Sequence, residues 1–400
     1  MSSTPRLFQM TGTCNNYPWG KKGRESLAAR LRAKTPSHTD LTIQHDEAYS
    51  ELWFGDYPDY PARVVESGRP LAEVIANDRE GLLGSDSVQR FGENMPFLPK
   101  DQILSIAKAL PLQTHPNKSL AAKLHQLHPD KFPDANHKPE IAVALSRFEL
   151  FAGWKEIDQI SPLFNLPSLR QFVPEGTREW DAETLRNVVR GLLKADEQTV
   201  QTIGEDLKQQ SDHDLNKASI LLCTDAGLLV AVLCMNFLVL RPGEGVFIPS
   251  DGIHSYLSGD ILECMARSNN MLCGGLYPVA DRDDIDLFCD SLLMDATTGV
   301  NNLRLEGKRS SDGARGHTTI YQPPISEFDV LRVDLAAGQE EILKRFKGPM
   351  VAMVISGQGK IVGDGKELEA KEGFIFFVGA GTTCTLRAHV SLQVFAAVVR

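Results

Sequence analysis

The chain has 400 residues, 42% of them hydrophobic and 24% charged, which is typical of a folded globular protein with two or three domains. Its formal net charge of −10 argues against a nucleic-acid binder, because such a protein needs clustered Lys and Arg to bind phosphates. The scattered cysteines include no CxxC pair, which excludes a typical disulfide framework and favours reduced thiols in the cytoplasm. No apolar run is long enough to span a membrane.

Proline and glycine punctuate the first 150 residues, as in NNYPWG, GDYPDYP and MPFLPKDQ. This composition favours short strands and loops over long helices. Two helices are expected as exceptions, at residues 25–34 and 117–127. In the second helix, Leu120, Leu124 and Leu127 recur at helical spacing on one face.

Residues 157–216 change in character and predict a helical insertion. The clearest segment is TLRNVVRGLLKADEQTV, and Asp181 is the expected N-cap of its helix. One face of this helix is apolar and consists of Leu185, Val188, Val189, Leu192 and Leu193. The preferred interpretation of the whole segment is a packing element without a chemical role.

Strand patterns return from residue 220. Residues 228–240 are interpreted as one or two buried strands, and LVLRPGEGVFIPSDGIHSYL as strands joined by a glycine-containing turn. A similar hairpin recurs in VAMVISGQGKIVGDGKELEAKEGFIFFVGAGTTCTL. The sequence therefore predicts a mainly β fold with an α-helical insertion, built as two jelly-roll β-barrels plus a helical domain.

Four residues form a candidate metal site. Gln113 and His115 in LQTHP lie two apart, so on a strand they point to the same side, and Glu140 and a later strand's His254 would complete the set. Two imidazoles and two oxygen ligands suit zinc, and also manganese, iron or cobalt, with water in the remaining position. On spacing alone, however, a hydrogen-bonded core histidine is the better interpretation, because a Q-x-H pair is common by chance.

The wider sequence resembles the type I phosphomannose isomerases. The matching segments run in family order over nearly the whole chain and are CNNYPWGKKG, YSELWFGDYP, LSIAKALPLQTHPNKSLA, PDANHKPEIAVAL and HSYLSGDILECMARSNN. The resemblance implies a monomer with one zinc ion on Gln113, His115, Glu140 and His254. It also implies a discontinuous metal-binding cupin at residues 1–155 and 220–300, a helical insertion domain at 156–219, and a C-terminal cupin-like domain without metal at 301–400.

The family interconverts mannose 6-phosphate and fructose 6-phosphate through a cis-enediol, whose oxyanion the metal stabilises. By resemblance, Glu263 is the acid/base that moves the proton, and Lys138 stabilises negative charge. Without the resemblance, both would be interpreted as ordinary ion-paired groups. Trp19 and Tyr256 are implied to line the sugar pocket, although packing alone would also explain them. His137 matches no ligand position and is interpreted as structural.

Several positions depart from the family pattern. In SNNMLCGGLYPV, Cys273 stands where the family has a catalytic arginine, and Val279 where it has a phosphate-binding lysine. Asp56, Tyr57 and Pro58 stand where the family has T-H-P, so the first two of these positions are replaced, and the other replaced positions are Pro111, Asn269 and Tyr277. Tyr57 and Cys273 are taken as parts of an altered substrate pocket. Cys273 is either a nucleophile or a small residue that opens space, and the second is preferred because nothing nearby in the sequence lowers its pKa.

Each lost charged hydrogen bond to a phosphate costs on the order of 1.5–3 kcal/mol, so the departures leave three hypotheses open. The first is a phosphomannose isomerase that binds phosphate through other cations, for which the candidates are Lys21, Lys22, Lys100, Lys118 and Arg267. The second is a zinc enzyme acting on an unphosphorylated polyol, hydroxy-ketone or natural-product intermediate. The third is a non-catalytic sugar- or partner-binding cupin. The retained ligands and Glu263 favour a zinc-dependent isomerase of a small molecule.

Overall fold

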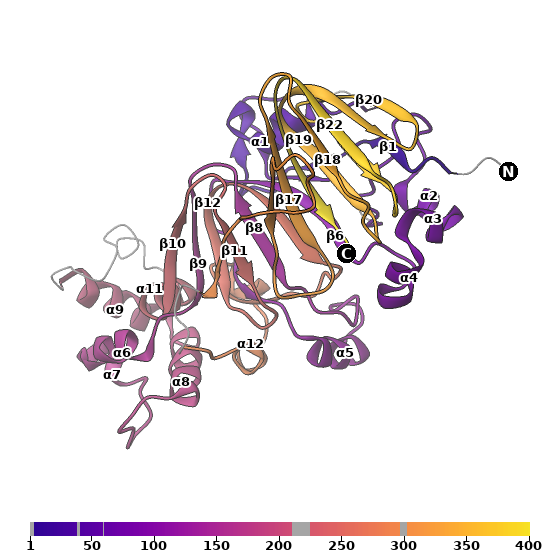
Figure 1. The fold of residues 1–400 in the computed structure, drawn as a ribbon. Coiled ribbons are helices and arrows are strands. Elements are labelled where there is room, and N and C mark those ends of the chain that lie inside the picture. The colour runs from indigo at the N-terminus through magenta and orange to yellow at the C-terminus, as the bar shows by residue number, and fades with distance from the viewer. Residues whose placement is uncertain (1–3, 38–40, 59, 210–224, 297–301) are drawn as a thin grey trace.

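The computed structural model describes residues 4–37, 41–58, 60–209, 225–296 and 302–400, without the side chains of residues 98–102 (Figure 1). Two large antiparallel sheets dominate the regular structure of these residues, which confirms the predicted mainly β fold with helices. The first sheet carries the candidate metal ligands, and the second is formed chiefly by the last hundred residues.

The first sheet has eleven strands and runs through the middle of the molecule. Its main path is β14 (Arg304–Leu305), β11 (Gly245–Ile248), β8 (Glu140–Ala144), β12 (His254–Ala266), β6 (Phe97–Ile106), β5 (Glu51–Trp53) and β2 (Thr13–Asn15). Off this path lie β7 (Leu112–Thr114), β9 (Phe148–Trp154), β10 (Met235–Leu240) and β13 (Leu272–Gly275). Strand β12 changes neighbours along its length, from β7 and β9 in its first part to β6 and β8 in its second.

The second sheet has nine strands and forms the orange and yellow lobe of Figure 1. Its path is β1 (Leu7–Met10), β21 (Ile375–Val378), β19 (Met350–Gly363), β22 (Cys384–Val398), β17 (Asp329–Leu335), β16 (Thr318–Tyr321) and β15 (Lys308–Arg309), with β18 (Glu340–Leu343) and β20 (Lys366–Lys371) beside it. The strand β1 pairs Leu7 with Val378, so residues 7–10 lie in the second sheet and not in the one expected for residues 1–155. Two further short strands, β3 (Lys21–Lys22) and β4 (Ala48–Tyr49), pair with each other.

The helices cover the ends of these sheets. They are α1 (Leu27–Arg32), α2 (Leu71–Asn77), α3 (Arg79–Leu83), α4 (Ser85–Phe91), α5 (Lys118–Leu127), α6 (Ile157–Ile160), α7 (Pro167–Arg170), α8 (Ala182–Leu193), α9 (Glu197–Gln209), α11 (Ala226–Cys234) and α12 (Ile285–Ser291). The short 3-10 helices of the described residues are η1 (Gly23–Glu25), η2 (Ser161–Asn165) and η3 (Val279–Asp281). The helices predicted at 25–34 and 117–127 correspond to α1 and α5, and Asn117 caps α5 by accepting a hydrogen bond from Leu120 N.

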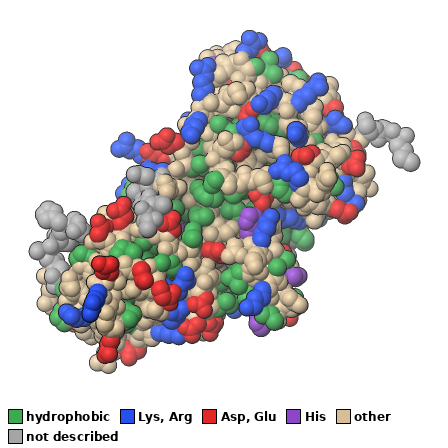
Figure 2. Space-filling model, turned by 60° about the horizontal axis from the view of Figure 1, so that its bottom comes forward, with side chains coloured by type: hydrophobic (Ala, Val, Ile, Leu, Met, Phe, Trp, Pro, Cys, Tyr) green, Lys and Arg blue, Asp and Glu red, His purple; other side chains and the backbone are tan. Residues whose placement is uncertain are grey.

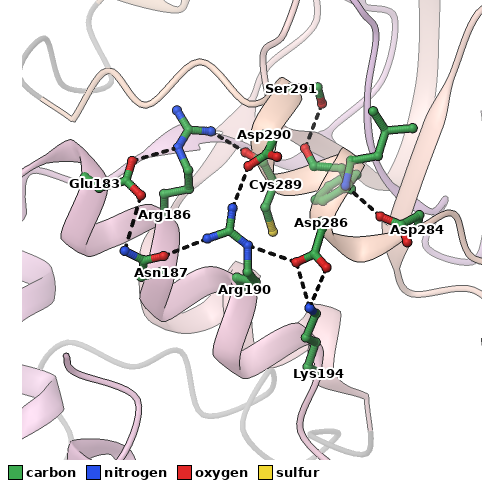
Figure 3. Close-up of polar contacts among 12 residues, drawn as sticks. Glu183, Arg186, Asn187, Arg190, Lys194, Asp284, Asp286, Cys289, Asp290 and Ser291 are labelled. Atoms are coloured by element: carbon green, nitrogen blue, oxygen red, sulfur yellow. Dashed lines mark hydrogen bonds and ion pairs between the residues drawn. The ribbon is translucent and has the colours of Figure 1, made fainter. Parts of the chain in front are cut away.

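The helical insertion is present, and α8 begins as predicted, with the Asp181 side chain accepting from Thr184 N. Its apolar face is buried, while its polar face binds α12 (Figure 3). There, Arg190 contacts Asp286 at 3.1 Å and Asp290 at 2.6 Å, and Lys194 contacts Asp286 at 2.7 Å. These exposed ion pairs add little stability each, so the apolar contacts hold the helical unit against the sheet, and the charges fix its orientation.

Two local predictions were wrong. Residues 228–240 do not form strands alone, because a buried helix, α11, precedes β10. A helix that is apolar on every side has no periodicity, so its sequence resembles a buried strand. The helices α2, α3 and α4 were not predicted in a segment interpreted as strands and loops. They are short and separated by Asp78 and Gly84, so none gives a long periodic signal.

Among the described residues, no helix is long and apolar enough to cross a bilayer. On the face shown in Figure 2, acidic and basic side chains are interspersed, and the described residues there form no continuous basic stripe. The expectation that nucleic acid is not a partner stays a prediction from the net charge of the chain.

Candidate metal centre

Three strands bring the predicted ligands together at one end of the first sheet. Gln113 lies in β7, directly opposite His254, the first residue of β12, and His115 follows one residue after β7 ends. Glu140 is the first residue of β8, which pairs with the second part of β12. Glu140 lies opposite Met265 near the end of β12, yet it contacts His254 at the start of the same strand, so the sheet curves back and brings the two ends of β12 together.

The histidines and the carboxylate form a compact, buried cluster. Ligand atoms of His115, Glu140 and His254 all lie within 4.8 Å of one another. The distance from His115 Nε2 to Glu140 Oε1 is 3.2 Å, and from His254 Nε2 to Glu140 Oε2 it is 3.4 Å. Both histidines are completely buried and Glu140 is 2% exposed. This geometry brings two imidazoles and one carboxylate around a single point.

The opposite nitrogen of each imidazole is held by a main-chain carbonyl. His115 Nδ1 donates to Asn270 O at 2.8 Å, and His254 Nδ1 donates to Gly252 O at 3.0 Å. Because a carbonyl only accepts, the proton resides on Nδ1 and the lone pair on Nε2 points at the cluster. Neither Nε2 atom has a hydrogen-bond partner among the described residues. Two buried lone pairs beside a carboxylate fit a divalent cation, and zinc accepts this donor set.

The protonation states also fit a metal ligand set. Burial and the charge of Lys138 lower the pKa of His115 to about 4, so this imidazole is neutral at neutral pH. Burial alone would raise the pKa of Glu140, but the charge of Lys138 holds it well below its ordinary value. Neutral imidazoles and an ionised carboxylate are the forms that bind metals.

A cavity of about 380 Å³ adjoins this cluster at Glu140, while His115 and His254 are not among its lining residues. Its lining combines charged, aromatic and aliphatic side chains and includes Gln113, Lys138, Glu140, Trp19, Tyr256, Glu263, Glu51, Trp53, Tyr17, Met271 and Tyr277. Gln113 faces the cavity beside Glu140, which leaves its role as a fourth ligand a prediction. This cavity therefore brings Glu140 together with four further predicted site residues, which are Lys138, Trp19, Tyr256 and Glu263.

Lys138 and Tyr256 have distinct environments in the cavity. Lys138 Nζ lies 2.9 Å from Glu140 Oε1. Burial alone would lower the pKa of Lys138, but Glu140 and Glu263 raise it, so the amine stays charged. Burial and then Glu263 raise the pKa of Tyr256 well above its ordinary value. Its hydroxyl is buried and has no hydrogen-bond partner among the described residues, so it can donate to a bound ligand.

Sequence reasoning did not single out Glu51 and Trp53, which also line the cavity. Glu51 is 8% exposed and accepts hydrogen bonds from Asn15 Nδ2 at 3.1 Å and Trp53 Nε1 at 2.6 Å. The signal was present in YSELW, because Glu51 and Trp53 lie two apart on one strand and so share a face. A carboxylate on the same buried face as a tryptophan is unusual in a packing strand.

Tyr57 and Cys273 lie outside the residues that line the cavity, so their part in substrate binding stays a prediction. The Tyr57 hydroxyl accepts from Asn269, and the Arg267 guanidinium lies 5.8 Å from the centre of its ring. Cys273 N donates to Asp283 Oδ2 at 2.6 Å. Burial and then Asp283 raise the pKa of the Cys273 thiol to about 12, which disfavours the nucleophile interpretation.

Three of the five cations considered for phosphate binding have carboxylate partners. Lys21 Nζ lies 2.6 Å from Asp260, Lys118 Nζ 3.7 Å from Glu327, and Arg267 2.5 Å from Asp56. Lys22 is exposed in β3, and the side chain of Lys100 lies outside the described part of the chain. Val279 is 77% exposed, so it contributes nothing to the cavity lining.

Two buried imidazoles and a carboxylate next to a cavity define a candidate metal site of the kind found in metalloenzymes, on a mainly β scaffold. The model for the family "Phosphomannose isomerase type I, catalytic domain" matches residues 7–157. A mannose-6-phosphate isomerase of Ogataea parapolymorpha is 33% identical over 94% of this chain and 94% of its own length. That of Saccharomyces cerevisiae is 31% identical over 96% of both chains. The chain therefore belongs to the mannose-6-phosphate isomerase family.

Solved structures share the fold along the whole chain. A zinc-bound mannose 6-phosphate isomerase is 23% identical, has a TM-score of 0.82, and covers 99% of this chain and 100% of its own. The apo enzyme from Salmonella typhimurium is 23% identical, has a TM-score of 0.81, and covers 99% of each chain. The arrangement of the two sheets and the helical unit is thus the arrangement of those enzymes.

Proposed function

We propose that the chain is a zinc-dependent aldose–ketose isomerase that interconverts mannose 6-phosphate and fructose 6-phosphate. The observation that carries the proposal is the pair of buried Nε2 lone pairs, on His115 and His254, beside the ionised Glu140. Glu140 also lines a cavity that holds Glu263 and Lys138. Family membership over the full length supports the same activity.

Gln113, His115, Glu140 and His254 would hold the zinc ion. When bound, zinc supplies positive charge that stabilises the oxyanion developing on the substrate during proton transfer. The cluster already contains neutral imidazoles and a carboxylate in the required protonation states. Binding the cation would also give the two buried Nε2 atoms the partner that the described residues do not provide.

The remaining chemistry falls to side chains in the cavity. In the forward direction Glu263 takes the proton from carbon 2 of the aldose and returns it to carbon 1, while the hydroxyl proton moves between the two oxygens. Glu263 is 5% exposed, so it reaches the substrate without competition from bulk water. Lys138 and the Tyr256 hydroxyl donate hydrogen bonds to substrate oxygens as charge develops. Trp19 offers an apolar face to the sugar ring.

Phosphate binding must differ from the pattern of the family. Cys273 is buried outside the cavity lining and Val279 faces solvent, so neither replaces the expected cation. Among the described lining residues Lys138 is the cation, and it also contacts Glu140. We therefore expect mannose 6-phosphate to bind with a high KM, because charged hydrogen bonds to its phosphate are missing.

The finer architecture belongs to the same proposal. We take the first sheet as the catalytic cupin barrel and the second as a cupin-like barrel without metal, with residues 156–219 as the inserted helical domain. The pairing of β1 with β21 assigns residues 7–10 to the second barrel. A monomeric, cytoplasmic enzyme fits the free thiols of the described cysteines.

The test is turnover of mannose 6-phosphate by the purified, zinc-loaded protein, followed as fructose 6-phosphate in a coupled assay. Activity that disappears on chelation and in Glu263→Gln would support the proposal. A double variant, Cys273→Arg with Val279→Lys, restores the two cations of the family pattern, and a lower KM would show that these positions reach the phosphate although neither lines the cavity. No turnover by either protein, with zinc bound, would reject mannose 6-phosphate and leave an unphosphorylated substrate as the alternative.

A further inference from the structure

Asn270 connects two segments of the candidate metal centre. It follows β12, is completely buried, and uses both its main chain and its side chain. Its carbonyl oxygen accepts from His115 Nδ1 at 2.8 Å. Its Nδ2 lies 2.7 Å from Asp134 O and 3.1 Å from Asn136 O, both in the loop that leads to Lys138 and Glu140. Asn270 thus contacts the candidate ligand His115 through its main chain, and the loop before Glu140 through its side chain.

Asp134 forms further hydrogen bonds between the loop before Glu140 and the loop after β12. Its Oδ1 accepts from Asn136 N at 3.0 Å and from Asn270 Nδ2 at 3.1 Å, and its Oδ2 accepts from Asn269 N at 2.9 Å. Asn136 Nδ2 in turn donates to Arg267 O at 2.9 Å. The loop before Glu140 and the loop after β12 are therefore tied by hydrogen bonds from both directions.

The burial of Asn270 makes these bonds hard to replace. Water does not reach a fully buried amide, so removing its N–H donors would leave the carbonyls of Asp134 and Asn136 without this partner. The loop after β12, which carries the Asn270 carbonyl that orients His115, would then lose its side-chain hydrogen bonds to the loop before Glu140. A histidine ligand whose Nδ1 acceptor moves no longer aims its Nε2 lone pair at one fixed point.

We propose that Asn270 is a positioning residue that sets the distance and orientation between His115 and the Glu140 loop, and so determines the affinity of the centre for a divalent cation. It does not touch the cation or the substrate. The proposal rests on the zinc-dependent function proposed above, but it concerns metal affinity and not turnover.

The test compares zinc binding in Asn270→Asp with the unmodified protein. This near-isosteric change keeps the main-chain carbonyl, removes both N–H donors, and puts a carboxylate beside Asp134. The matched control is Glu341→Gln, the reverse exchange at a buried position of β18 in the second sheet, where Glu341 Oε1 accepts from Arg315 N at 2.7 Å. The dissociation constant for zinc is measured by competition with a chromogenic chelator. Ligand geometry is read from the visible absorption of the cobalt-substituted proteins.

We expect Asn270→Asp to weaken zinc binding about 10–100-fold and to change the cobalt spectrum, as loss of an outer hydrogen-bond partner does. Glu341→Gln should leave both unchanged. Asp134→Asn, a milder change, should shift zinc affinity in the same direction and serves if Asn270→Asp does not fold. An unchanged dissociation constant in the variants, with tight binding by the unmodified protein, would overturn the role of Asn270 alone. Failure of the unmodified protein to bind zinc would overturn the proposed cofactor as well.

Discussion

The two sheets each bury a glutamate, and the two carboxylates have opposite surroundings. In the second sheet, Glu341 is completely buried and accepts from the main-chain N–H groups of Arg315, His317 and Ile342. In the first sheet, Glu140 is nearly as buried, but its neighbours are Lys138 and two imidazole nitrogens that lack other partners. Main-chain donors satisfy the Glu341 carboxylate permanently, whereas the set around Glu140 is complete only with a cation.

This contrast separates a structural carboxylate from a functional one by the identity of its partners and not by its burial. Burial alone would raise the pKa of both groups, and in both the surroundings lower it again. A shifted pKa therefore does not distinguish them. The unpartnered nitrogen atoms at Glu140 do, because a folded protein rarely leaves buried polar atoms without a partner unless a ligand occupies the site.

The largest expected effect comes from Glu140→Gln. Without the carboxylate, the site keeps two imidazoles beside the charged Lys138, which repels a cation. We expect zinc affinity to fall by more than about a hundredfold, beyond what outer-shell changes produce, and isomerase activity to disappear. Zinc is measured by chelator competition and activity by the coupled assay. Retention of tight zinc binding would show that Glu140 is structural, like Glu341.

Glu263→Gln should separate chemistry from metal binding. The amide keeps the shape of the side chain but cannot accept the proton from carbon 2. We expect kcat to fall roughly 10²–10⁴-fold, the usual contribution of a general base, with zinc affinity unchanged. Steady-state kinetics on the zinc-loaded variant tests this. A variant with normal kcat would move the acid/base role to another cavity residue.

The complementary exchange in the second sheet, Glu341→Gln, should affect stability only. The amide nitrogen would face backbone N–H groups, so at least one buried hydrogen bond is lost. We expect a cost of about 1–3 kcal/mol in the free energy of unfolding, with zinc affinity and kcat preserved. Thermal denaturation measures the first and the two assays above the others. Loss of zinc from this variant would contradict the separation of the two sheets.

The smallest expected effect is a pH-dependent change in stability at the hydrogen bond between Glu327 and His137. Glu327, before β17, accepts from His137 Nε2 at 2.7 Å. Burial alone would raise the pKa of Glu327, but the hydrogen bond and charge of His137 lower it from 4.5 to about 2. A depressed pKa contributes stability above pH 4.5 that is lost as the pH falls from 4.5 towards 2.

Glu327→Gln should therefore be less stable than the unmodified protein at neutral pH, and the difference should shrink as the pH falls through that window. Urea denaturation at a series of pH values measures it. A constant difference across the window would show that the Glu327 carboxylate contributes no charge-dependent stability, and that its contact with His137 matters only for packing.

The sequence predicted those parts of the fold that carry a clear period or a clear turn. The helix α8 with its Asp181 cap and the strands around β12 and β19 were predicted, because amphipathic periodicity and glycine turns are local signals. The helix α11 was not, because its neighbours bury it on all sides and its sequence has no polar face. The pairing of β1 with β21 has no local signal at all.

The same distinction between features with and without a local sequence signal applies to the site. Spacing placed Gln113 and His115 on one face, but only the family resemblance connected them with Glu140 and His254. The acceptors that orient the imidazoles, Asn270 O and Gly252 O, are main-chain atoms, and any residue type supplies a carbonyl. Backbone geometry fixes them, so the residue letters alone do not reveal them.

The position of β1 has a consequence for how the chain is made. Leu7 pairs with Val378, so the first strand leaves the ribosome long before its partner has been synthesised. During that interval β1 has unpaired main-chain groups and an exposed apolar face, the features that promote contact with other nascent chains. Chaperone binding to this segment, and aggregation of chains whose translation stops before residue 375, would follow from the same pairing.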